Sequence, residues 1–92
     1  WVSAAKVDDT KAAFDFTIYP NPTDQWVSIK TAYSGLFEVR IYDLLGTLIY
    51  HNNMEAYLSI DTEAWNKGIY IIEIQDLADN NLSKQHKVVI AN

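Results

Sequence analysis

Two histidines, His51 and His86, are the side chains best suited to act as a general base beside a serine nucleophile. Such a serine commonly sits in a Gly-x-Ser-x-Gly elbow, and the sequence contains no elbow of this kind. His51 directly follows the apolar run 48–50, and His86 lies between Lys84 and Val88 in the last run of strand-forming residues. We therefore interpret both histidines as strand residues with ordinary contacts.

Paired carboxylates could also carry chemistry, because two of them can serve as acid and base in glycoside hydrolysis. The acidic residues that could form such a pair all lie where turns, caps or solvated strand faces are expected: Asp43, Asp61, Glu63, Glu73, Asp76 and Asp79. The stretch 76–81 offers oxygen ligands for Ca²⁺, but it lacks the glycine and the terminal glutamate of the standard calcium loop. The absence of cysteine excludes thiol nucleophiles and thiolate metal sites. We therefore expect no enzyme activity, no metal and no cofactor.

Aromatic side chains give a third kind of site, because a row of exposed rings on a strand face can stack on sugars. Trp26, Tyr33 and Tyr42 would lie close together only if their strands are neighbours on an outer face. Aromatic residues are also good strand formers, and they often cover sheet faces without binding a ligand. A carbohydrate-binding or adhesive β-sandwich appended to a secreted enzyme is therefore the alternative function.

Charge and hydropathy exclude several classes of partner. The net charge is −5, which argues against nucleic acid and against electrostatic docking on anionic lipid. No apolar run approaches 18 residues, so we expect no membrane insertion. The N-terminus lacks a basic region followed by an apolar stretch, so any export signal is expected upstream, on a longer parent chain. The chain is 49% hydrophobic, which is enough to fill one core, and we expect the isolated domain to be a monomer.

The elements that must position these residues are β-strands. From Phe14 onward, most runs alternate apolar and polar residues with period two, and Gly, Pro, Asn and Asp separate the runs. Residues 69–75 are instead nearly continuously apolar, as is typical of a central strand. Seven strands are predicted, at residues 14–19, 26–30, 37–42, 47–51, 57–60, 69–75 and 84–90. Short strands at about ten-residue spacing, without a long helical pattern, indicate an all-β domain with two packed antiparallel sheets.

The turns between the strands have specific chemistry. Pro20 and Pro22 remove two backbone donors and should stop the first strand. Asp43 to Gly46 is typical of a type I turn with a glycine bulge. Asn52 and Asn53 tolerate left-handed geometry and should end the fourth strand.

Two further features lie near the sixth strand. Residues 61–65 are typical of one helical turn capped by Asp61 or Thr62, with Trp65 closing one end of the core. Tyr70 follows Gly68 just inside the strand, where a tyrosine hydroxyl can bond back across the corner of a sandwich.

Residues 1–13 show no clean period and are rich in Ala, Ser, Asp and Lys. We interpret them as a linker from an upstream parent protein, although a short strand at Trp1 and Val2 is an alternative. The domain proper should span residues 14–92. Any cleavage would need an extended, accessible segment, and the small residues around positions 3–5 and 12–13 qualify.

Taken together, the motifs resemble those of the C-terminal sorting domain (type A) of the type IX secretion system. The resemblance covers residues 14–92 and rests on the order and spacing of five segments: 16–23, 27–29, 39–46, 67–72 and 84–90. The matching structural motif residues are Pro20, Asn21, Pro22, Asp43, Gly46, Gly68 and Tyr70. The matching residues of the terminal strand, where such domains concentrate their sorting information, are Lys84, Lys87, Val88, Val89 and Ile90.

This resemblance implies an immunoglobulin-like sandwich of about seven strands at the C-terminus of a large exported protein. The parent would pass through the periplasm, and the outer-membrane translocon would recognise the folded domain. A sortase-like cysteine peptidase would then remove the domain at the cell surface, leaving the parent joined to an anionic lipopolysaccharide or released. A final strand at a sheet edge suits recognition of this kind, because its unpaired backbone groups can accept another strand.

Overall fold

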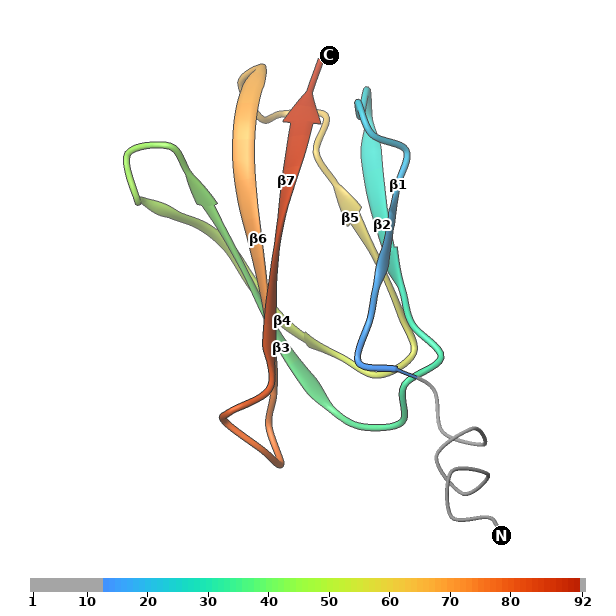
Figure 1. Cartoon of the computed structure of the whole chain (residues 1–92). Coiled ribbons are helices and arrows are strands. Elements are labelled where there is room, and N and C mark those ends of the chain that lie inside the picture. The colour runs from blue at the N-terminus through green and yellow to red at the C-terminus, as the bar shows by residue number, and fades with distance from the viewer. Residues whose placement is uncertain (1–12, 92) are drawn as a thin grey trace, which may run out of the picture.

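The computed structural model describes residues 13–91, and within them the chain is all-β (Figure 1). The predicted linker, residues 1–13, lies outside the described residues except for Ala13, and so does the alternative strand at Trp1 and Val2. The described strands are β1 Thr17–Tyr19, β2 Trp26–Lys30, β3 Phe37–Asp43, β4 Leu48–Met54, β5 Tyr57–Asp61, β6 Gly68–Asp76 and β7 Ser83–Ile90. The predicted count of seven strands is confirmed.

The strands form two antiparallel sheets that face each other, which confirms the predicted sandwich. The smaller sheet has the order β1-β2-β5, and the larger has the order β4-β3-β6-β7 (Figure 1). Strand β6 is therefore interior, paired with β3 from Tyr70 to Asp76 and with β7 from Gly68 to Gln75. Strand β7 is an edge, with a sheet neighbour on one side only.

The core lies between the sheets and follows the alternation of the sequence. In β3 the side chains of Phe37, Val39 and Ile41 are fully buried, while Glu38 and Arg40 between them are half-buried on the outer face. The inward side chains of β6 and β7 complete the same layer: Tyr70, Ile72, Ile74, Val88 and Ile90. The strand pattern thus sets which residues can be reached from outside and which cannot.

Aromatic rings close one end of the core around Phe37. Phe16 packs edge-on against it with ring centroids 5.2 Å apart, and Phe14 and Tyr33 tilt against it at 5.9 and 6.0 Å. Strand β1 begins only at Thr17, so the predicted strand start at residue 14 is wrong. The residues before β1 contact the core through their rings without pairing to β2, because the β1–β2 ladder ends at the Thr17–Lys30 pair.

The fourth strand is longer than predicted. Asn52 and Asn53 do not end it, because both pair with β3, opposite Val39 and Glu38. Met54 is 3% exposed, and burial of its side chain holds the strand end against the core. Pairing with β3 therefore outweighed the local preference of asparagine for the end of a strand.

The segment after β5 is a hydrogen-bonded turn and not a helix. The Trp65 amide donates to the Thr62 carbonyl at 3.0 Å, and the Glu63 amide donates to the Asp61 carboxylate at 2.9 Å. The Asp61 carboxylate thus bonds the backbone after it, but it closes a turn, so the predicted helical turn is wrong. The half-buried Trp65 ring packs against Tyr70, with ring centroids 5.2 Å apart, at one end of the core.

Candidate functional site

The outer edge of β7 joins two motifs that lie far apart in the sequence. Strand β7 pairs with β6 in one continuous antiparallel register, from Gly68 opposite Ile90 to Gln75 opposite Ser83. In such a ladder each edge residue directs both backbone groups toward its neighbour or both away from it. Val89 directs both groups away from β6, so Gln85, Lys87 and the other odd-numbered residues of β7 do the same.

The Pro20–Thr23 segment covers the C-terminal part of this edge. The Asn21 side chain donates its amide to the Lys87 carbonyl at 3.2 Å and accepts from the Val89 amide at 3.1 Å. The Thr23 amide donates to the Val89 carbonyl at 2.7 Å, and the Thr23 carbonyl accepts from the Ala91 amide at 2.7 Å. The first and last motifs of the sequence therefore form one hydrogen-bonded unit.

The sequence analysis missed this role of the turn and assigned it only the ending of β1. An asparagine side chain carries the same donor and acceptor as a peptide group, so Asn21 can act as one more strand residue beside β7. Thr23 continues the contact as a parallel bridge to Ile90 and is fully buried. Its hydroxyl donates to the Pro20 carbonyl, which closes the turn on itself.

The five residues predicted for recognition fall on two faces of β7. Val88 and Ile90 are 1% exposed and lie in the core. Lys84 and Lys87 are exposed, and Val89 is half-buried. Only these last three therefore have side-chain surface that a partner could contact in the folded domain.

The two lysines of β7 differ in their surroundings. The Lys84 ammonium lies 3.9 Å from the Asp15 carboxylate, which links β7 to the segment before β1. Lys87 forms no ion pair with any residue between Ala13 and Ala91. Positive charge on this edge is thus partly neutralised at one end of the strand and left free nearer its middle.

The remaining motif residues form turns that hold β3 and β6. The Asp43 carboxylate accepts from the amides of Leu45 and Thr47, each at 2.9 Å, and Gly46 has φ of 87°. That φ lies in the left-handed region, as a glycine-bulge turn requires, so the predicted hairpin is confirmed. The Tyr70 hydroxyl donates to the Asn66 carbonyl at 2.6 Å, which confirms the predicted tyrosine corner.

The predicted carboxylate candidates mostly serve the backbone. The carboxylates of Asp43, Asp61, Asp76 and Asp79 each accept from the amide two residues further on, the geometry of an Asx turn. Glu73 instead lies 3.6 Å from Arg40, on the outer face of the larger sheet. Among residues 13–91, no three His, Cys, Asp or Glu side chains gather closely enough to hold a metal ion.

A small network of charged side chains lies on the outer face of the larger sheet. Glu38 accepts from Arg40 at 2.8 Å, and its other carboxylate oxygen lies 2.7 Å from the His51 ring. The Glu38 carboxylate, with a smaller contribution from Glu73, raises the pKa of the Arg40 guanidinium. His51 thus lies in a surface network without a serine partner, and His86 faces the interior beside the buried end of β7.

The three aromatic residues singled out from the sequence do not share a face. Trp26 lies on the outer face of β2, Tyr42 on the larger sheet, and Tyr33 in the cluster around Phe37. A different set gathers on the outer face of the smaller sheet: Tyr19, Trp26 and Tyr57 are 37%, 45% and 54% exposed.

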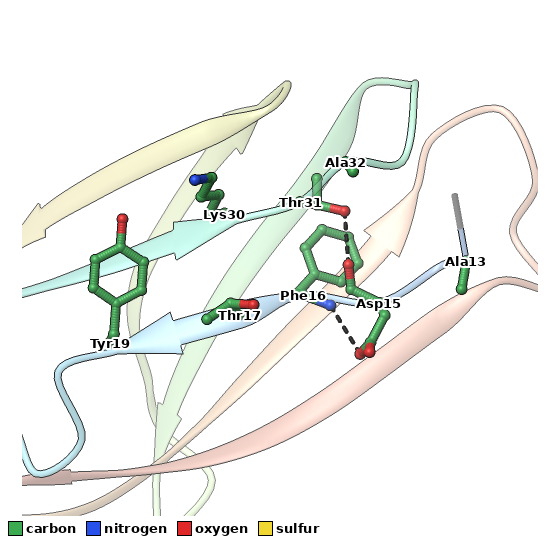
Figure 2. A pocket seen from close by; sticks show the side chains of 8 residues that line it. All are labelled: Ala13, Asp15, Phe16, Thr17, Tyr19, Lys30, Thr31 and Ala32. Carbon is green, nitrogen blue, oxygen red and sulfur yellow. Dashed lines mark hydrogen bonds between the residues drawn. The ribbon is translucent and has the colours of Figure 1, made fainter. Parts of the chain in front are cut away.

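These rings cover a polar residue and adjoin a surface hollow. Ser28 lies beneath them, fully buried, and its hydroxyl is 2.9 Å from that of Tyr57. The neighbouring hollow has a volume of about 580 Å³. Of the residues that line it, Tyr19 and Lys30 rise from adjacent strands (Figure 2). Its far end is fixed by Thr31, whose hydroxyl donates to the Asp15 carbonyl at 2.6 Å (Figure 2).

Comparison with known proteins agrees with this architecture. The chain is similar to the crystal structure of a DUF3244 family protein with an immunoglobulin-like β-sandwich fold from Bacteroides vulgatus ATCC 8482. The TM-score is 0.71 at 18% identity, over 90% of this chain and 88% of that one, so the likeness establishes the fold. No curated protein matches significantly. Between Ala13 and Ala91 there is no long apolar helix of the kind that spans a bilayer.

A family model identifies the chain more specifically. The model of the secretion system C-terminal sorting domain matches residues 17–91, from the first residue of β1 to the residue after β7. The match includes the Pro20–Thr23 segment and the strand it covers. The chain therefore belongs to the family of C-terminal sorting domains of the type IX secretion system.

Proposed function

We propose that this domain is the signal by which the outer-membrane translocon recognises the parent protein and exports it, and that it has no catalytic role of its own. The observation that carries the proposal is the family match over the whole sandwich. The β7 edge supports it, because an edge strand has backbone groups that another protein can pair with. The parent would reach the cell surface or the medium after transit through the periplasm.

The proposed recognition residues act in two ways. Lys84, Lys87 and Val89 would contact the translocon through side chains that are exposed or half-buried, Lys87 and Val89 on the outer face of β7 and Lys84 at the rim of the face that carries Val88. Val88 and Ile90 would act through the fold, because their side chains anchor the strand in the core. The structural motif residues would hold β7 in place from its two flanks, with Pro20, Asn21 and Pro22 on the outer side and Asp43, Gly46, Gly68 and Tyr70 within the larger sheet.

We further propose that a sortase-like peptidase cuts the chain within residues 1–13, a linker that precedes the sandwich of residues 14–92. Ala13 is exposed where the described chain begins. The parent would then be joined to lipopolysaccharide or released, and the isolated domain would be a monomer. Mass spectrometry of the domain recovered from the medium would locate the cut.

A reporter fusion tests the export function. The full 92-residue chain is placed after a signal peptide and a periplasmic reporter, in a host that has the secretion system. We expect the reporter at the cell surface, accessible to added protease, while a matched fusion ending at Ser83 leaves it in the periplasm. Retention of the reporter with the intact chain, while the domain resists proteolysis and is therefore folded, would show that the proposal is wrong.

Carbohydrate binding is the second candidate, and the rings of Tyr19, Trp26 and Tyr57 on one face favour it. Stacking of a sugar on Trp26 would change its fluorescence, so titration with soluble glycans should give a saturable signal. The variant Trp26→Ala should lose that signal, and Tyr42→Ala, on the other sheet, should keep it. A flat titration of the intact chain removes this candidate.

A further inference from the structure

The outer edge of β7 is divided into a closed part and an open part. The closed part runs from the Lys87 carbonyl to the Ala91 amide, and Asn21 and Thr23 occupy its four backbone groups. The open part runs from Ser83 to the Lys87 amide. Within residues 13–91, no hydrogen bond is made by the outward backbone groups of Ser83 and Gln85 or by the Lys87 amide.

The backbone groups of Ser83 and Gln85 and the Lys87 amide are directed away from the larger sheet, and an added strand could pair with them. The alternation of the ladder fixes this direction, because the Leu82 carbonyl, one residue before Ser83, bonds inward to Asp76 at 3.0 Å. The side chains of Ser83, Gln85 and Lys87 are exposed, so none of them covers the edge. These outward groups are therefore the ones with which an added strand would pair.

The two lysines beside the open part determine which kind of chain could pair with it. Lys87 has no acidic partner in the described chain, and Lys84 has only a 3.9 Å contact with Asp15. Pairing of two copies through this edge would add a second Lys84 on one face and a second Lys87 on the other, and this repulsion disfavours self-association. An extended segment that carries acidic side chains would instead gain charge pairs as well as backbone hydrogen bonds.

We propose that an extended, acidic segment of the secretion machinery adds to β7 as a strand along Ser83–Lys87, and that the Asn21 contact sets where this pairing ends. The inference rests on the proposed function and specifies how the domain would be recognised. The added strand is short, because Asn21 already holds the Lys87 carbonyl and the Val89 amide. Recognition would then depend on the backbone at Gln85 and on the charge of Lys87.

A proline substitution at Gln85 tests the backbone part. Gln85→Pro removes an outward amide and places a ring where the added strand would lie, while all bonds to β6 remain. The matched control is Ser59→Pro on the edge of the smaller sheet. Ser59 is also exposed and also directs its amide outward, because the Ala56 carbonyl and the Thr62 amide, an odd number of residues away on either side, bond inward to the two residues that flank β2.

Both proline variants are made in the 92-residue chain and assayed with the export reporter, with circular dichroism to establish folding. We expect surface delivery to fall about tenfold for Gln85→Pro and to stay unchanged for Ser59→Pro. Lys87→Asp, which leaves the backbone intact, should also fall about tenfold by repelling an acidic segment. If Gln85→Pro does not fold, surface delivery by Lys87→Asp still tests whether the partner segment is acidic.

The outcomes separate this inference from the proposed function. Failure of the unsubstituted chain to deliver the reporter contradicts the sorting role itself. Delivery by the unsubstituted chain, with equal delivery by folded Gln85→Pro and Lys87→Asp, overturns strand addition and leaves the sorting role standing. A concentration-dependent dimer that Gln85→Pro abolishes would show that the occupant of the edge is a second copy, and it would also overturn the proposal.

Discussion

The substitution Phe37→Ala is expected to lower the free energy of unfolding by about 3–5 kcal/mol. The Phe37 ring is 0% exposed and contacts the rings of Phe14, Phe16 and Tyr33 with centroid distances of 5.2 to 6.0 Å. Removal of the ring loses its own burial and leaves a cavity that the three neighbours can only partly fill. Urea unfolding of the intact chain, followed by circular dichroism, measures the change.

The loss is large relative to the whole domain. A chain of this length has a total stability of about 5–14 kcal/mol, so the variant would retain a small margin or none. Delivery of the export reporter should fall with the folded fraction. The matched control is Leu45→Ala, because Leu45 is 91% exposed at the β3–β4 turn and should change stability by less than about 0.5 kcal/mol. An unchanged urea midpoint for Phe37→Ala would contradict the assignment of Phe37 to the centre of the core.

Strand identity was predictable from the sequence because burial alternates with period two. Strand β3 follows that pattern residue by residue, and the turn that connects it to β4 is fixed by local chemistry at Asp43 and Gly46. The strand ends were less predictable. Phe14 packs like a core strand residue without pairing, and Asn52 pairs although its type favours a turn. In both cases a contact distant in the sequence outweighed the local preference.

The candidate site was predictable only in its parts. The sequence identified the Pro20–Thr23 turn and the last strand as separate motifs, and it placed unpaired backbone groups on that strand. Their contact depends on bonds between residues 66 and 68 positions apart, and no local pattern encodes these. The asparagine between two prolines was the one local sign of this contact. Its side-chain amide can donate to a neighbouring strand, as the backbone of the two prolines cannot.

The terminal motif Lys87–Ile90 combines two functions that the sequence could not separate. Alternate side chains point into the core and out to solvent, so adjacent positions of the same motif differ completely in surroundings. Val88 is 1% exposed, opposite Tyr70 of β6, whereas Lys87 is exposed and without an ion pair in the described chain. Substitution of these two neighbours by the same residue should therefore separate the stability of the fold from recognition by the translocon.

The substitution Val88→Asp is expected to destabilise the domain by more than about 4 kcal/mol, because it places an unpaired carboxylate among apolar side chains. Lys87→Asp is the matched control, since it adds the same carboxylate to the same strand on the solvent side and should leave the fold intact. Circular dichroism and protease resistance measure folding, and the export reporter measures recognition. We expect Val88→Asp to lose both, and Lys87→Asp to stay folded while delivery falls about tenfold. If Val88→Asp delivered the reporter while unfolded, the translocon would be reading a linear sequence, and the sandwich would not be the signal.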